Sequence, residues 1–214
     1  MTSLIFDLDN TLIDFMRFKR FSCEAAIDAM IDAGLSMGKK EALDKLYSLY
    51  HEEGLEDPLI FQKFLDEVGK MDYRMLAYGI VAYRRVRTAF LRPYPRVAST
   101  LRELQRRGYN LAILSDAPKL KAWIRLTNMG LDNFFDPVVA HEDTGVYKPG
   151  KEPFLLIKEK LPGECVMIGD NPERDLAGAR ACGMKACFAR YGSDKDEAEA
   201  DYVIDSIEEL LDIF

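Results

Sequence analysis

Two carboxylates one residue apart follow an apolar run near the start of the chain, which reads Leu4-Ile5-Phe6-Asp7-Leu8-Asp9-Asn10-Thr11. Such a run predicts a buried strand whose last residues reach the carboxyl edge of a parallel sheet, where open α/β folds hold their ligands. Two acids at that edge repel each other unless a cation or a proton lies between their oxygens. Asp7 and Asp9 therefore indicate a metal site, a nucleophile with a partner acid, or both.

Three further polar segments come shortly after predicted strands. Ser115-Asp116 follows Leu111–Leu114, Lys148-Pro149 comes within a short loop after Val138–Ala140, and the segment from Gly169 to Asp175 follows Cys165–Ile168. Taken singly, a serine at a strand end is usually a turn residue, and an aspartate near a helix start is usually a cap. Because the ends of parallel strands open on the same crevice, the four polar groups can converge, and we expect one site.

Together these motifs resemble the haloacid dehalogenase superfamily. Asp7 to Thr11 match its D-x-D-x-T opening, Ser115 and Lys148 match its isolated serine or threonine and its lysine, and Gly169 to Asp175 match its closing G-D-x-x-x-x-D. The motifs occur in the order of the family and extend over the whole chain. The resemblance implies a hydrolase with a sheet core and an inserted helical cap.

From Pro95 onward, helical and strand patterns alternate. The expected strands are 110–114, 137–140, 165–168, 185–189 and 202–204, and the expected helices are 97–107, 119–128, 152–161, 173–182 and a last one at the C-terminus. Such alternation is typical of a parallel sheet flanked by helices. The fold class is therefore α/β, with a Rossmann-like parallel sheet core.

Residues 14–91 have helical periodicity throughout. Apolar residues recur at three-and-four spacing in four stretches, glycines at 34 and 69 mark helix ends, and Asp57-Pro58 is interpreted as an N-cap followed by the first helical residue. We expect a four-helix cap domain over residues 14–91, inserted into a core domain of residues 1–13 and 92–214. Because the loop that leaves Asp9 leads directly into it, this domain should lie over the active-site rim.

Composition narrows the partners. The 29 lysines and arginines against 36 acidic residues give a net charge of -7, which repels polyanions and disfavours nucleic-acid binding. The arginines at 84, 85, 87 and 92 are interpreted as the solvated face of a helix. The sequence has no signal-peptide pattern, no window as long as a membrane span and no C-x-x-C pairing among its four cysteines. We expect a cytoplasmic protein with no membrane partner.

The expected chemistry is phosphoryl transfer, which needs a cation, fixed donors and an in-line nucleophile. Asp7 suits the nucleophile, and its attack would form an aspartyl-phosphate. Mg²⁺ is the expected cofactor because it prefers oxygen ligands and needs only a few carboxylates. Asp7 and Asp170 would be side-chain ligands, and the resemblance adds the backbone carbonyl of Asp9. The Asp9 carboxyl can then protonate the leaving alkoxide and deprotonate the attacking water.

Four residues are assigned to the phosphate group. Ser115 offers a hydroxyl, backbone N–H groups near Thr11 and Asp116 add further donors, and Lys148 contributes a compact cation. Asp175 is expected on the first turn of its helix, where it could hold Lys148 or a metal-bound water.

The main prediction is a Mg²⁺-dependent phosphatase for a small phosphorylated metabolite, and the alternatives stay open. Haloacid dehalogenases proper carry a tyrosine where this chain has Asp9, so that activity is the runner-up. A phosphosugar mutase would keep the same motifs, and a binding protein could use the same fold without catalysis. The segment Phe15 to Arg20 mixes aromatics with three cations and suits either substrate contact or packing with solvated charges. His51 and His141 lie outside the motifs and are interpreted as structural.

Overall fold

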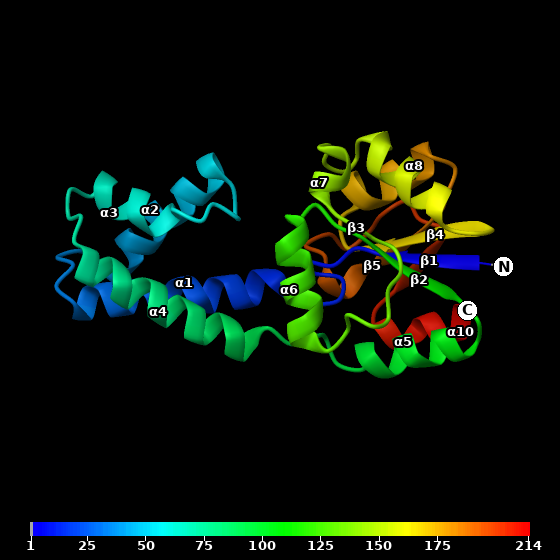
Figure 1. The fold of residues 1–214 in the computed structure, drawn as a ribbon, viewed down its shortest axis with the longest axis horizontal. Helices are drawn as coiled ribbons and strands as arrows, with labels where there is room; N and C mark the ends of the chain where they lie inside the picture. The colour runs from blue at the N-terminus through cyan, green and yellow to red at the C-terminus, as the bar shows by residue number, and fades with distance from the viewer. Residues whose placement is uncertain (1) are drawn as a thin grey trace. The chain divides into compact units, whose positions relative to one another are not determined.

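A computed structural model describes residues 2–214 of the chain. They divide into two compact units, the first formed by the residues up to Phe15 together with Arg92–Phe214 and the second by Met16–Leu91 (Figure 1). The first unit contains the sheet and all of the motif residues. Each unit has its own hydrophobic core.

Within residues 2–214, six parallel strands form one sheet in the order β3-β2-β1-β4-β5-β6. Their bounds are β1 Thr2–Phe6, β2 Asn110–Leu114, β3 Val138–Val139, β4 Glu164–Gly169, β5 Lys185–Ala189 and β6 Tyr202–Ile204. Strand β1 is central, because Phe6 pairs with Ile113 of β2 on one side and with Ile168 of β4 on the other. Residues that follow these three strands therefore leave the sheet side by side.

The side chains of the central strands alternate between two cores, as expected for a sheet covered on both faces. Leu4 and Phe6 pack in the cluster that includes residues of α5, α6 and α10, whereas Ile5 packs in the cluster that includes residues of α8 and α9. Figure 1 shows α5 and α10 on one side of the sheet and α8 on the other. The predicted α/β fold with a Rossmann-like parallel sheet flanked by helices is confirmed.

The helices of the first unit follow the predicted ones closely, with two differences. Their bounds are α5 Val97–Arg106, α6 Lys119–Met129, α7 His141–Thr144, α8 Lys151–Lys160, α9 Ala177–Ala181 and α10 Leu210–Ile213. The short helix α7 lies where the sequence predicted only a loop. The helix after β4 begins with a π-helical turn over Pro172–Leu176, where an ordinary α-helix was expected.

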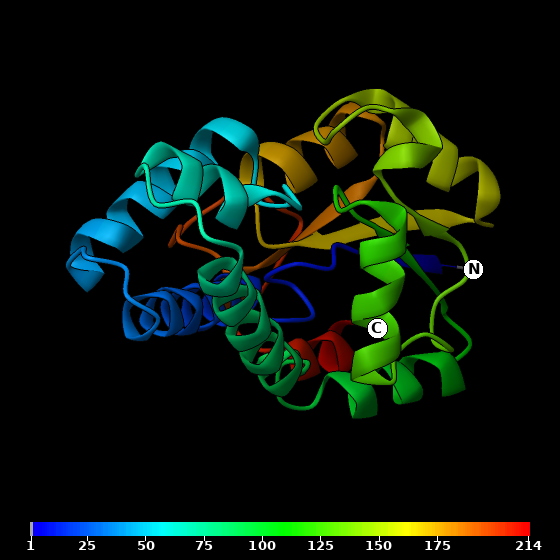
Figure 2. The same cartoon turned by 60° about the vertical axis from the view of Figure 1, so that its left-hand side comes forward.

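The second unit consists of helices, which run from blue through cyan to teal in Figure 2. Their bounds are α1 Phe15–Asp32, α2 Lys39–Glu53, α3 Ile60–Glu67 and α4 Tyr73–Phe90. The expected start of the third helix at Asp57 is wrong, because α3 begins at Ile60 and the Asp57 carboxylate accepts a hydrogen bond from Leu59 N at 2.8 Å. Asp57 thus stabilises the turn that precedes α3. In the described part of the chain, no helix combines the length and apolarity needed to cross a bilayer.

Candidate active site

The loop after β1 carries Asp7, Asp9 and Thr11, and its backbone folds into a tight turn. Asn10 has a left-handed φ of 62°, which asparagine tolerates better than most residues. Asn10 N donates to Ile13 O at 2.6 Å, and Leu12 N donates to Leu8 O at 3.0 Å. These bonds fix the path of the chain from Leu8 to Ile13.

A segment from the far end of the chain supports this loop. Tyr191 donates its hydroxyl proton to Thr11 O at 2.7 Å. At Gly192 a Cβ would lie 1.7 Å from Asn10 O, so only glycine allows so close an approach. The loop that carries the acids is therefore held by residues about 180 positions away.

Lys148 lies at the centre of the site and is almost fully buried. Its Nζ is 2.5 Å from Asp7 Oδ1, 2.6 Å from Asp175 Oδ1 and 3.1 Å from Leu114 O. Its backbone N–H donates to Asp116 Oδ1 at 2.9 Å, which ties the lysine loop to the end of β2. Burial disfavours the charged form of Lys148, but the surrounding carboxylates outweigh it and raise its pKa well above the ordinary value.

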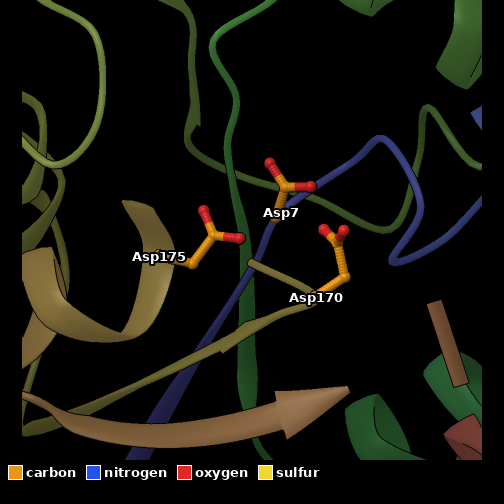
Figure 3. Close-up of side chains that lie close together, drawn as sticks. All are labelled: Asp7, Asp170 and Asp175. Carbon is orange, nitrogen blue, oxygen red and sulfur yellow. The ribbon is translucent and has the colours of Figure 1, made fainter. Parts of the chain in front are cut away.

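Three buried carboxylates surround this cation. Oxygen atoms of Asp7, Asp170 and Asp175 lie within 4.8 Å of one another. Figure 3 shows the three groups gathered beyond the ends of β1 and β4. Burial and the neighbouring carboxylates raise the pKa of Asp7 well above its ordinary value, and burial with the charge of Asp175 raises the pKa of Asp170 to about 7.

The charge balance of this cluster favours a bound cation. Lys148 pairs with both Asp7 and Asp175, so one ammonium faces two carboxylates, and Asp170 adds a third carboxylate to the same cluster. Burial is the main cause of the raised pKa of Asp170, and the charge of Asp175 adds to it. Carboxylate oxygens are the ligands that Mg²⁺ and Ca²⁺ prefer. The donor set of Asp7 and Asp170 therefore fits a hard divalent cation.

Thr11 joins the first loop to the end of β4. Its Oγ1 accepts from Asp170 N at 3.1 Å and lies 3.4 Å from Asp170 Oδ1. The Thr11 side chain is fully buried and is used in this contact. Any role of Thr11 in phosphate binding would therefore rest on its backbone N–H.

Ser115 and Asp116 occupy the end of β2, next to β1. Ser115 is buried, and its Oγ accepts from Ala117 N at 3.1 Å. The Asp116 carboxylate accepts from Lys148 N and also pairs with Arg174 Nη1 at 3.4 Å. The Asp116 carboxylate thus positions the loop that carries Lys148. The sequence did not predict this role.

Asp175 is positioned by the residues that follow β4. Asn171 N donates to Asp175 Oδ2 at 3.1 Å, while the Asn171 side chain caps the helix by accepting from the N–H groups of Glu173 and Arg174. A Cβ at Gly169 would lie 2.5 Å from Asp175 Oδ2. The first glycine of the G-D-x-x-x-x-D motif therefore leaves room for its last aspartate to reach Lys148.

Asp9 lies outside the cluster of three buried carboxylates, and its side chain pairs with an arginine. Its Oδ2 accepts from Arg125 Nη1 at 2.9 Å, and its side chain is 26% exposed. Sequence reasoning missed Arg125. The available signal was its spacing on α6, where Ala122, Arg125 and Leu126 share the buried face and an arginine is out of place.

Comparisons with known proteins agree with this geometry. Residues 1–183 match the family model of haloacid dehalogenase-like hydrolases. The chain is 33% identical to the glyceraldehyde 3-phosphate phosphatase of Methanocaldococcus jannaschii, over 98% of this chain and 95% of the relative. It superposes on the crystal structure of a phosphatase of the same family from Thermococcus onnurineus with a TM-score of 0.73 and 26% identity, over 100% of this chain and 97% of the other.

A second solved structure is a hydrolase of this family from Bacillus subtilis with bound magnesium. It superposes with a TM-score of 0.72 and 25% identity, over 99% of this chain and 97% of the other. The family predicted from the four motifs is confirmed, and the chain belongs to the haloacid dehalogenase-like hydrolases as an enzyme of the phosphatase type.

Proposed function

We propose that this protein is a Mg²⁺-dependent phosphatase that hydrolyses a small phosphorylated metabolite through an aspartyl-phosphate on Asp7. The observation that carries the proposal is the position of Asp7 at the end of the central strand, 2.5 Å from a buried lysine and beside Asp170 and Asp175. A carboxylate held in this way has a fixed direction, and Lys148 beside it offers a positive charge to an entering phosphate dianion.

The reaction divides into two balanced steps. In the first, a carboxylate oxygen of Asp7 forms a bond to phosphorus while the bond from phosphorus to the substrate oxygen breaks, and Asp9 gives its proton to that oxygen. In the second, water attacks the phosphorus, Asp9 takes a proton from the water, and the bond to Asp7 breaks. Inorganic phosphate leaves, and both aspartates return to their starting states.

The metal would be held by the side chains of Asp7 and Asp170, with the backbone carbonyl of Asp9 as a third ligand. When bound, Mg²⁺ neutralises charge on the phosphate and on the carboxylates. Asp175 is not assigned as a ligand, because its Oδ1 lies 2.6 Å from Lys148 Nζ and its Oδ2 accepts from Asn171 N at 3.1 Å. Its role is to hold the lysine where the lysine contacts both Asp7 and the incoming phosphate.

Phosphate binding is assigned to the ends of β1 and β2. The Ser115 hydroxyl, backbone N–H groups near Thr11 and Asp116, and the Lys148 ammonium supply donors and positive charge for the phosphoryl oxygens. Because the Asp116 carboxylate already accepts from Lys148 N, its own side chain acts on the loop and not on the phosphate.

The first candidate substrate is glyceraldehyde 3-phosphate, on which the relative from Methanocaldococcus jannaschii acts by its name. Residues 16–91 are proposed as the cap that selects the substrate. In the segment Phe15 to Arg20, Lys19 is buried within its own unit, where Nζ donates to Leu55 O at 2.7 Å and lies 4.0 Å from the centre of the Tyr50 ring. Arg17, whose side chain is exposed, is therefore the better candidate for substrate contact.

A substrate screen tests the proposal. Purified protein is incubated with a panel of phosphorylated metabolites that includes glyceraldehyde 3-phosphate, with Mg²⁺ or with excess chelator, and released phosphate is measured. We expect phosphate release that requires the metal. Full activity with chelator would remove the proposed role of Asp170 as a metal ligand. An isomerised sugar phosphate without free phosphate would support the mutase. In a separate assay with a haloacid, release of halide would support the dehalogenase.

A further inference from the structure

Arg125 is a buried arginine on the core-facing side of α6. The residue is 6% exposed, and its helix neighbours Ala122 and Leu126 are fully buried in the core of the first unit. A guanidinium at such a position is unfavourable unless it has charged and hydrogen-bonding partners. The contacts of Arg125 therefore indicate what the residue does.

Two of these contacts fix the guanidinium. Nη1 donates to Asp9 Oδ2 at 2.9 Å, and the guanidinium carbon lies 4.8 Å from the centre of the Phe15 ring. The guanidinium thus has a cation–π contact with Phe15 and a hydrogen bond to the Asp9 carboxylate. Helix α6 follows directly on the segment that carries Ser115 and Asp116, so Arg125 is anchored to the same strand end as the proposed phosphate-binding residues.

We propose that Arg125 is a positioning residue that sets the direction of the Asp9 carboxyl for proton transfer. The proposal rests on the proposed function, in which Asp9 serves both steps of the reaction. A general acid or base must lie within hydrogen-bond reach of the oxygen it serves, and a displacement of about 1 Å lowers the rate about a hundredfold. Asp9 sits on a loop, so a rigid partner on a helix keeps its carboxyl in place.

This role predicts a dependence on the leaving group. Arg125→Gln should lower the turnover number about tenfold to a hundredfold for an alkyl phosphate, whose poor leaving group needs the acid of the first step. With an aryl phosphate the first step survives, and the loss should be confined to the attack of water. Arg125→Lys keeps the charge without the planar fork and should recover part of the loss.

A double-mutant cycle tests the assignment. Turnover number and KM are measured with an aryl and an alkyl phosphate for the wild type, Arg125→Gln, Asp9→Asn, the double variant and Arg125→Lys. Arg106→Gln is the matched control, because Arg106 is an exposed arginine that pairs with Glu103 of its own helix. If Arg125 acts through Asp9, Arg125→Gln slows the aryl phosphate when Asp9 is intact but has no further effect once Asp9→Asn is present.

Two results would overturn the proposal. One is a wild-type turnover number in Arg125→Gln. The other is an equal loss of turnover from Arg125→Gln in the wild type and in Asp9→Asn, because a residue that only maintains the fold would act independently of the Asp9 carboxyl. Thermal unfolding of each variant shows whether the fold is kept, and Arg125→Lys supplies a second readout if Arg125→Gln is unstable. Failure of the proposed function has another signature, because Asp7→Asn would then still hydrolyse phosphate esters.

Discussion

Lys148 Nζ lies 2.5 Å from Asp7 Oδ1, although 141 residues separate the two in the chain. The same ammonium lies 2.6 Å from Asp175, so one buried cation serves two buried acids. The parallel topology makes this possible, because the lysine loop follows β3 and the two acids follow β1 and β4 on the same edge of the sheet. Asp7, the proposed nucleophile, is thus held by a lysine from a loop that is distant in the sequence.

Replacing this cation should affect both activity and stability. Lys148→Met leaves Asp7 and Asp175 buried without their shared partner, and we expect loss of turnover and a fall of about 3 kcal/mol in the free energy of unfolding. Lys119→Met is the control, since its ion pair with Asp143 lies nearer the surface than that of Lys148 and should contribute less than about 1 kcal/mol. Denaturant titration of both variants measures the difference. Equal stability of the two would show that the buried lysine does not balance the acids.

Without metal, the stability of the protein should fall as the pH rises. The pKa of Asp170 is raised to about 7 from an ordinary value of 3.8, so the folded protein keeps a proton that the unfolded chain releases. The contribution of this proton to the free energy of unfolding is fully present below the pKa of the unfolded chain, and it is lost as the pH rises through about 7. Asp7, whose pKa is also raised, acts in the same direction.

The measurement is thermal unfolding in chelator at about pH 6 and about pH 8. We expect the higher midpoint at the lower pH, a smaller difference in Asp170→Asn, and a gain from Mg²⁺ that is largest at the higher pH because the metal binds ionised carboxylates. A higher midpoint at the higher pH in chelator would contradict the charge balance assigned to the cluster.

Gly192 should be intolerant of a side chain. A Cβ there would lie 1.7 Å from the backbone oxygen of Asn10, so Gly192→Ala must displace the loop between Asp7 and Thr11. We expect a loss of about 1–3 kcal/mol in stability and a drop in turnover of about a hundredfold, because the acids move with the loop. Gly38→Ala is the control, since a Cβ at that position meets nothing within 4 Å. Unchanged turnover in Gly192→Ala would show that the contact has no functional role.

Arg17 should influence substrate choice more than chemistry. If residues 16–91 select the substrate, Arg17→Ala should alter the ratio of kcat/KM values between a sugar phosphate and acetyl phosphate and leave acetyl phosphate within about threefold of the wild type. Arg20→Ala, which removes an exposed arginine of the same helix, is the matched control. Equal losses for both substrates would indicate that Arg17 maintains the fold. Phe18 is unsuitable for this test because it is buried.

Much of the core could be predicted because its signals are local. Leu111–Leu114 is an apolar run bounded by polar residues, and the structure has β2 over Asn110–Leu114. Helix α7 was missed because four residues are too few to show periodicity, and Asp57 was misread because a turn and an N-cap use the same side-chain bond.

The contacts within the site depend on partners that sequence spacing does not reveal. Asp9 and Arg125 are 116 residues apart, and an arginine on a helix is ordinarily interpreted as solvated. Tyr191 and Gly192 lie outside the four motifs, and nothing in their immediate neighbourhood indicates that they hold the loop around Asn10. The motifs predict which residues share the rim, whereas the tertiary structure determines which of them touch.

Asp7 and Asp9 have different roles in the proposed reaction. Asp7→Asn replaces the nucleophile by an amide and should abolish phosphoenzyme formation with every substrate. Asp9→Asn should still be phosphorylated by an aryl phosphate or acetyl phosphate, which leave readily without an acid, but water attack then lacks its base. The phosphorylated protein should therefore accumulate in the second variant.

Intact-mass spectrometry of acid-quenched protein distinguishes these two roles. After exposure to acetyl phosphate, Asp9→Asn should carry one added phosphoryl group that hydroxylamine removes, as an acyl phosphate requires, and Asp7→Asn should carry none. If neither variant is phosphorylated and both lose all substrates alike, Asp9 is a structural or metal-positioning residue and the two-step account is contradicted.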